Sequence, residues 1–360
     1  MISPKPLNDL RSLKCTSANE LMDIAFKPHP QVIERFLYSG LYILAGAPKI
    51  GKSFLTLQLA QHIATGTPIW GLKVTESSVL YMSLEDTLDR LQRRYYQMFG
   101  ETSDGSPNLY FCTRASLLNN GLLEEMENSL KEHPDIKVII IDTLQTIREY
   151  STQISYSNDY EVITQLKRFA DEHNLCLLVV HHTRKLEADD AFETISGTNG
   201  LLGAADGAFV LKKPKRSETR AVLNVVGRDI ADLQIKLEFD RGKLIWVLTE
   251  FEVKPYQTPL DKDIELINKF LAEKWTGSAT DLLKEIPEIK LAANTLTRKL
   301  NANTSILLNN YGIKYVNNPR GKTRSISLIR IKKEKSAEDT KNFENAGNSY
   351  RIVPFTEFHK

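Results

Sequence analysis

The stretch GAPKIGKS at residues 46–53 decides the fold, because it satisfies every position of the pattern G-x-x-x-x-G-K-[ST]. The apolar run LYILA at 41–45 precedes it, and FLTLQLA at 54–60 follows with helical spacing and without glycine or proline. Strand, loop and helix come in the order of a phosphate-binding loop, in which backbone N–H groups and a helix N-terminus face the phosphates. The sequence predicts a nucleotide site here, and the flanking strand and helix weigh against the alternative of a glycine-rich turn.

Two side chains of this loop are expected to make the main contacts with the phosphates and the metal ion. Lys52 should reach the β- and γ-phosphates, and the Ser53 hydroxyl should ligate Mg²⁺. Gly46 and Gly51 permit the backbone to come close to the phosphates. The residues predicted to contact the nucleotide are Gly46, Ala47, Pro48, Lys49, Ile50, Gly51, Lys52, Ser53 and Phe54.

Composition and charge set the broad class. The 360 residues carry a net charge of +2 and are 41% hydrophobic and 26% charged, which is ordinary for a globular protein. No apolar run approaches ~18 residues and the N-terminus lacks a signal-peptide pattern, so we expect a cytoplasmic protein without a membrane partner. The three cysteines, Cys15, Cys112 and Cys176, are far apart and indicate neither a metal site nor a disulfide framework.

Carboxylates follow two of the next apolar runs. SVLYMSL at 78–84 ends at Glu85 and Asp86, and Glu85 is our candidate for orienting and polarising an attacking water. The alternative is that both acids only favour a helix N-terminus. KVIIID at 137–142 ends in Asp142 and fits the Walker B pattern, whose carboxylate holds hydrated Mg²⁺, although an Asp after a strand is by itself common.

A fourth apolar run, LCLLVV at 175–180, ends in His181 and His182. A polar residue at this strand end can hydrogen-bond a γ-phosphate, and His182 is the preferred sensor. A buried, satisfied histidine pair is the alternative, and zinc is disfavoured because no third ligand has suitable spacing. Beyond it lie a small-residue run at 198–207, expected to be mobile, and several strands expected to form an antiparallel edge.

Together, GAPKIGKS, SLED, IIIDT, VVHHTRK, ISGTNGLLGAADG and VVGRDI resemble the RecA-like ATPases, and more closely the RepA-type hexameric helicases of plasmids and mobile elements. The resemblance covers about residues 20–250. It implies an α/β fold with a RecA-like P-loop NTPase core, a mostly parallel sheet and an antiparallel edge. It further implies ATP and Mg²⁺ at subunit interfaces of a homo-oligomeric ring, a hexamer in that family. The roles it carries over are phosphate and metal contacts for Lys52 and Ser53, the catalytic glutamate for Glu85, the Walker B acid for Asp142 and the γ-phosphate sensor for His182.

The resemblance also gives Arg228, in the segment GRD, a role as a finger that reaches the ATP of a neighbouring subunit. A local ion pair with Asp229 or Asp232 is the alternative. The run 198–207 contains no arginine, whereas some RepA-type helicases place one there.

The C-terminal part is basic: residues 261–333 hold 14 Lys and Arg against 7 Asp and Glu. Three helical stretches, the first with Ile264, Ile267 and Trp275 on one face, precede two alternating strands around a hairpin tip, and this order resembles a small winged-helix-like α+β domain. A protein-binding module with a solvated basic face is the alternative. The candidate contacts to duplex DNA are Arg298, Lys299, Arg320, Lys322 and Arg324. The predicted organisation is an N-terminal arm at 1–38, the ATPase domain at 39–250, a linker at 251–262, the winged-helix-like domain at 263–333 and a flexible tail at 334–360.

These predictions favour an ATP-hydrolysing DNA motor or replication protein, a ring-forming RepA-like helicase. Its inner loops, 148–158 and 183–203, would contact single-stranded DNA, with Arg184 and Lys185 as candidate contacts. An ATP-dependent DNA-binding regulator or loader without unwinding activity is the alternative, and a third class is an ATPase that acts on proteins alone.

Overall fold

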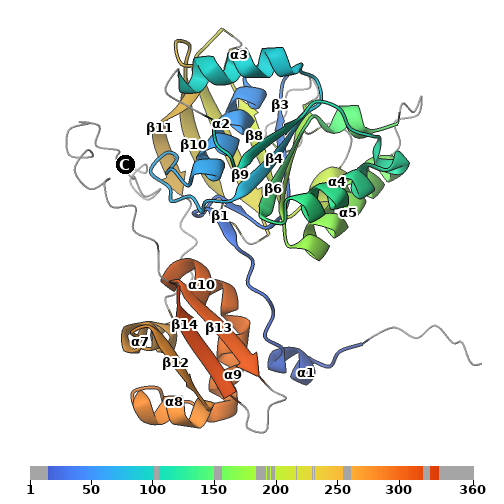
Figure 1. Ribbon diagram of the computed structural model, residues 1–360. Coiled ribbons are helices and arrows are strands. Elements are labelled where there is room, and N and C mark those ends of the chain that lie inside the picture. The colour runs from blue at the N-terminus through green and yellow to red at the C-terminus, as the bar shows by residue number, and fades with distance from the viewer. Residues whose placement is uncertain are drawn as a thin grey trace, which may run out of the picture. The chain divides into compact units, whose positions relative to one another are not determined.

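The computed structural model describes residues 15–100, 105–149, 156–183, 192, 195, 199–215, 217–228, 230, 232–253, 261–318 and 325–331. They form two compact units (Figure 1). The large unit begins at Gln31, earlier than the residue 39 expected from the sequence, and its described part ends at Val253. The small unit joins residues 15–30 to residues 261–331.

The large unit is built on a nine-stranded sheet in the order β11-β10-β9-β8-β3-β7-β6-β4-β5. The strands from β8 to β5 run parallel to one another, and β9, β10 and β11 add an antiparallel edge. A short hairpin of β1 and β2 lies outside this sheet. The strands are β1 (Gln31–Ile33), β2 (Leu37–Tyr38), β3 (Gly40–Gly46), β4 (Ser78–Ser83), β5 (Leu109–Cys112), β6 (Ile136–Asp142), β7 (Cys176–His182), β8 (Gly207–Lys212), β9 (Arg220–Gly227), β10 (Leu233–Asp240) and β11 (Ile245–Val253).

Helices cover both faces of the parallel strands, which explains why those strands read as continuous apolar runs. Alternate residues of β3 face opposite sides: Tyr42 and Leu44 join a core with α2, whereas Leu41 and Ile43 join a core with α4 and α5 (Figure 1). The helices are α2 (Lys52–Thr65), α3 (Leu88–Phe99), α4 (Leu122–Glu132), α5 (Tyr156–His173) and α6 (Asn199–Ala204), with 3₁₀ turns η1 (Leu118–Asn120) and η2 (Leu144–Ile147).

The sheet order brings the predicted strand ends to one edge. Gly46 pairs in parallel register with His182, and Ser83 with Asp142. Because β7 lies between β3 and β6, the strand carrying the P-loop and the strand ending in Asp142 are separated by one strand. The result is the RecA-like α/β core expected from the sequence, with its ligand edge at the carboxyl ends of the parallel strands.

The small unit packs helices against a three-stranded antiparallel sheet in the order β12-β14-β13. Ser278 forms the expected cap of α8, through a capping box with Asp281. The sequence prediction was wrong for Trp275, which lies in strand β12 rather than on a helical face, and it missed α10. The elements are α1 (Ala18–Asp23), α7 (Lys262–Phe270), β12 (Lys274–Gly277), α8 (Ala279–Glu285), α9 (Ala293–Ala302), α10 (Thr304–Tyr311), β13 (Ile313–Asn318) and β14 (Ser325–Arg330).

Candidate active site

The P-loop joins the buried end of β3 to the first turn of α2. Gly51 caps α2 with φ +103°, a conformation that residues with a Cβ rarely adopt. A Cβ added there would also lie 2.9 Å from Cζ2 of Trp246. The second glycine of the motif is therefore required both by the backbone and by the space beside it.

Trp246 of β11 supports the loop from behind, and the sequence analysis missed it. Its side chain is completely buried, and its Nε1–H donates to the carbonyl oxygen of Gly51 at 3.0 Å. Gln58 of α2 exchanges two hydrogen bonds with the Trp246 backbone, at 3.0 and 2.7 Å. No motif links residues so far apart in sequence, and only the sheet topology brings β11 against α2.

Lys52 folds back over the loop. Its Nζ donates to the carbonyl oxygens of Gly46 at 2.8 Å and Ala47 at 3.0 Å, and lies 3.1 Å from Nδ1 of His182. The side chain is 5% exposed. Burial lowers the pKa of Lys52 from its ordinary 10.5 to about 8, while the charges of Asp142 and Glu85 oppose this shift. A buried ammonium in this position is a receptor for an anion such as a phosphate.

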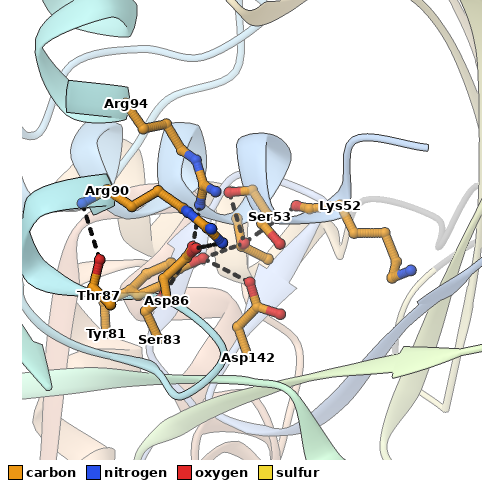
Figure 2. Close-up of polar contacts among 10 residues, drawn as sticks. Lys52, Ser53, Tyr81, Ser83, Asp86, Thr87, Arg90, Arg94 and Asp142 are labelled. Atoms are coloured by element: carbon orange, nitrogen blue, oxygen red, sulfur yellow. Dashed lines mark hydrogen bonds and ion pairs between the residues drawn. The ribbon is translucent and has the colours of Figure 1, made fainter. Parts of the chain in front are cut away.

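Asp142 ends β6 and is 4% exposed. The Tyr81 hydroxyl donates to its Oδ2 at 3.1 Å (Figure 2). The same hydroxyl lies in hydrogen-bond contact with the Thr56 hydroxyl, 2.8 Å away. Burial raises the pKa of Asp142, and hydrogen bonds from Ser53 and Tyr81 act against this rise. The Ser53 hydroxyl and the Asp142 carboxylate supply oxygen donors, the ligands that Mg²⁺ prefers beside substrate phosphates. Their pairing fits the predicted metal position.

Glu85 and Asp86 are neighbours with different surroundings. Glu85 is exposed at the edge of the sheet and accepts a hydrogen bond from Thr143 at 2.9 Å, next to Asp142. Asp86 is nearly buried and pairs with Arg94 at 2.6 Å and Arg90 at 3.2 Å (Figure 2). Asp86 thus anchors α3, while Glu85 faces the strand that carries the Walker B acid.

His182 ends β7 beside the P-loop, as the register with Gly46 requires. Burial, together with the charge of Lys52, lowers its pKa, so the imidazole is neutral at pH 7 and its Nδ1 can accept from Lys52. His181 is buried in the same strand. Among the described residues, no cluster of three His, Cys, Asp or Glu side chains could hold a metal ion.

Arg228 lies away from this edge. It follows Gly227, which pairs with Gly207, and Gly207 in turn pairs with Tyr42 near the start of β3. Tyr42 and Gly46 are four residues apart along the strand, or about 13 Å at ~3.3 Å per residue. The guanidinium is exposed and donates to the carbonyl oxygen of Gly203 at 2.9 Å. Arg228 is therefore at the opposite end of the sheet from the P-loop of its own chain.

The predicted DNA contacts are only partly described. Arg298 of α9 pairs with Asp23 at 2.8 Å, and Lys299 pairs with Asp261 at 2.8 Å and also with Asp263. The remaining predicted contacts lie outside the described residues; they are Arg184, Lys185, Arg320, Lys322 and Arg324.

The P-loop at the end of β3, the acid at the end of β6 and the strand order define a RecA-like P-loop ATPase. The chain belongs to the AAA_25 family, described as an AAA domain, whose model matches residues 7–188. The match includes the P-loop, Glu85, Asp142 and His182.

Named relatives match part of the chain. It is 27% identical over 150 residues to the DNA repair protein RadA of Campylobacter jejuni, covering 40% of this chain and 29% of that protein. It is 28% identical over 217 residues to the DNA repair protein RadA of Streptococcus pyogenes serotype M6, covering 59% and 42% respectively. The chain thus spans less than half the length of these relatives.

A solved structure also matches part of this chain. The KaiC-like protein PH0186 of Pyrococcus horikoshii OT3 matches with a TM-score of 0.46 and 16% identity, over 62% of this chain and 98% of that one. Within the described residues, no helix combines the length and the apolar character needed to cross a membrane.

Proposed function

We propose that this protein is an ATP-hydrolysing DNA motor or replication protein that assembles as a homo-oligomeric ring, a hexamer as in the RepA-type helicases. The main support for ATP hydrolysis is that four side chains lie together at one edge of the sheet, around the P-loop. They are Lys52, Asp142, Glu85 and His182. These groups supply a cation for phosphates, a metal-binding carboxylate, a base for water and a γ-phosphate sensor.

Each group has a defined part in the hydrolysis of ATP to ADP and phosphate. Lys52 exchanges its contacts with the carbonyl oxygens of Gly46 and Ala47 for the β- and γ-phosphates. Glu85 orients a water for attack on the γ-phosphorus and accepts its proton, while the bond to the β–γ bridging oxygen breaks. Ser53 and Asp142 would hold Mg²⁺, which would supply positive charge beside the phosphate oxygens.

His182 connects the site to the segment that follows β7. It neighbours Lys52 and precedes residues 183–203, which we assign to the inner wall of the ring and of which 199–203 form part of α6. Loss of the γ-phosphate removes a hydrogen-bond partner from this histidine, and the loop behind it responds. Arg184 and Lys185 of that loop remain our candidates for contacts with single-stranded DNA.

The proposed oligomer rests on the role we assign to Arg228. Because it lies at the far end of the sheet from its own P-loop, a role in hydrolysis requires the ATP of a neighbouring copy. A trans-acting arginine stabilises charge on the transferred phosphoryl group. The homo-oligomeric part of the proposal therefore depends on this residue.

The DNA half has two supports. The relatives named above are DNA repair proteins, and the order of elements in the small unit resembles that of a winged helix with one additional helix, since α7, β12, α8, α9 and α10 precede the β13–β14 pair. In such modules the third helix enters the major groove of a duplex. Here that helix is α9, with Arg298 and Lys299 as candidate contacts.

The test is ATP turnover with and without single-stranded DNA, together with the mass of the assembly in the presence of ATP. We expect stimulation by DNA in the wild type, loss of turnover in Lys52→Ala, and an ATP-dependent increase in mass. Turnover that DNA leaves unchanged would contradict the motor assignment, and a monomer with bound ATP would contradict the ring.

The winged-helix-like order also favours a second candidate, an ATP-dependent DNA-binding regulator or loader. A strand-separation assay with a forked duplex distinguishes the two. A motor separates the strands in an ATP-dependent reaction, whereas a regulator binds duplex in a salt-dependent manner without separating them.

A further inference from the structure

The N-terminal segment forms a strap across the helices of the small unit. We define the α1 strap as residues 17–29, which contain α1 and pack against α9 within that unit. Beyond α1, the backbone N–H of His29 donates to Ser305 Oγ at 3.1 Å, and Asn309 donates to the His29 carbonyl oxygen at 3.1 Å. The strap therefore follows both α9 and α10.

Two residues of the strap bind Arg298, one of the two cations of α9. The Arg298 guanidinium donates to Asp23 Oδ1 at 2.8 Å and to Asn19 Oδ1 at 2.6 Å. Lys299, the other cation of α9, is held by Asp261 and Asp263 at the start of α7. Both cations of the helix are thus engaged by acids of the same chain rather than offered to an external anion.

The buried side-chain amide of Asn301 fixes the position of the strap on α9. Asn301 of α9 is 3% exposed and accepts hydrogen bonds from Tyr315 and Asn317, each at 3.0 Å. Its own Nδ2 donates to the carbonyl oxygen of Met22 at 3.1 Å. The strap thus meets a preformed polar hub on α9, which makes its position specific.

The attachment is nevertheless weak. α1 has six residues and buries none of them, and a helix of this length is marginal in water without tertiary support. The Arg298–Asp23 pair is exposed, with 33% and 60% of the two side chains accessible, and exposed ion pairs contribute little. The Arg298–Asp23 pair can therefore open at small cost, and salt will weaken it.

We propose that the α1 strap is an intramolecular lock that competes with duplex DNA for α9. The proposal rests on the proposed function, because it assumes that α9 is the helix that meets the duplex. With the strap in place, Asp23 occupies Arg298 and α1 covers part of the face of α9. Release of the strap frees the guanidinium for a DNA phosphate and removes the nearby acid from the path of the DNA backbone.

The test compares duplex affinities of the full chain by fluorescence anisotropy with a short labelled duplex at fixed salt. Asp23→Asn removes the charge that holds Arg298, and Asn19→Ala removes a neutral partner of the same guanidinium without changing the net charge. Glu20→Gln is the matched control: it removes one charge from α1, yet Glu20 turns back onto Ser17 and caps the helix. We expect about threefold tighter binding for Asp23→Asn and for Asn19→Ala, and no change for Glu20→Gln.

The outcomes separate the lock from the proposed function. Equal affinities for the wild type and both strap variants would overturn the lock while leaving duplex binding intact. Equal tightening by Asp23→Asn and Glu20→Gln, with none by Asn19→Ala, would reduce the effect to net charge and also overturn it. Absence of duplex binding in every protein, including the variants with Arg298 released, would overturn duplex recognition itself and the lock with it. Faster amide exchange at residues 18–23 on addition of duplex is the independent sign of release that the lock requires.

Discussion

The P-loop edge of the large unit and the α9 surface of the small unit both rely on charged side chains, but they hold them differently. Lys52 and Asp142 are nearly buried: Lys52 begins α2 and is held by the P-loop carbonyl oxygens, and Asp142 ends β6 in register with Ser83. Arg298 and Lys299 are partly exposed, and their partners are acids from other segments of the small unit. Burial strengthens the attraction between a charge and an oppositely charged ligand, whereas an exposed ion pair contributes little and is readily replaced. The first arrangement suits chemistry and the second suits reversible attachment.

The largest expected effect is that of Arg228→Ala, which tests whether the P-loop edge is complete within one chain. We expect ATP turnover to fall by about 10³–10⁵, because a trans-acting arginine would be missing. A mixture of the Arg228→Ala and Lys52→Ala proteins should regain turnover, since each supplies what its neighbour lacks. Arg220→Ala, at the other end of the same strand, is the control. A mixture as inactive as its components would show that Arg228 does not act between subunits.

Glu85→Gln and Asp86→Asn test whether two adjacent carboxylates have different roles, the first in hydrolysis and the second in stability. We expect Glu85→Gln to lower turnover by about 10²–10⁴ through loss of the general base, with ATP binding retained. Asp86→Asn should loosen α3 and lower the melting temperature, because Arg94 loses its partner, while turnover changes little. Phosphate release, nucleotide titration and thermal unfolding measure the three quantities. Unchanged turnover in Glu85→Gln would remove the assigned role.

The burial of Lys52 predicts that the free energy of unfolding depends on pH. Its pKa is about 8 in the folded protein against an ordinary 10.5, so between these values the unfolded chain binds more protons than the folded one. The free energy of unfolding should rise with pH across this window, by about 3 kcal/mol. Urea unfolding of the wild type and of Lys52→Met isolates the effect, because the difference between the two proteins cancels the other groups. A difference that stays constant from pH 8 to 10.5 would mean that burial does not lower the pKa of Lys52 in the folded protein.

Trp246→Phe tests the support behind the loop and is expected to have the smallest effect. It removes the indole donor from the Gly51 carbonyl oxygen, which still accepts from the Leu55 N–H, so the expected cost is about 0.5–1.5 kcal/mol in the free energy of unfolding. Trp70→Phe removes a donor to the Trp246 carbonyl oxygen, and it should cost less because Trp70 is only partly buried whereas Trp246 is completely buried. Equal losses in denaturant unfolding would argue against a special role for the Gly51 contact.

The sequence was most informative where function depends on neighbours in the chain. The P-loop geometry at Gly51 and Lys52 follows from a contiguous motif, and the strand ends at Asp142 and His182 were recognised from apolar runs that stop at polar residues. The helix that begins after Ser278 was likewise recognised from its cap. Local rules succeed here because the interactions they describe are local.

Contacts between distant segments were not predictable in this way. Thr143 beneath Glu85 and Trp246 beneath Gly51 carry no pattern of their own. Trp275 was misassigned because one apolar residue at helical spacing fits either a helix or a strand until its partners are known. The acids that hold Arg298 and Lys299 were invisible for the same reason.

The sequence by itself determined that residues 46–53 carry the phosphate-binding-loop motif and that Asp142 and His182 end buried strands, because a motif and the lengths of apolar runs are properties of contiguous residues. The tertiary structure alone decided which groups meet there and which do not. Strand order placed β7 between β3 and β6, the antiparallel edge carried Arg228 to the far end of the sheet, and the N-terminal segment came to lie on α9. These outcomes depend on the packing of segments more than a hundred residues apart, which no local pattern encodes.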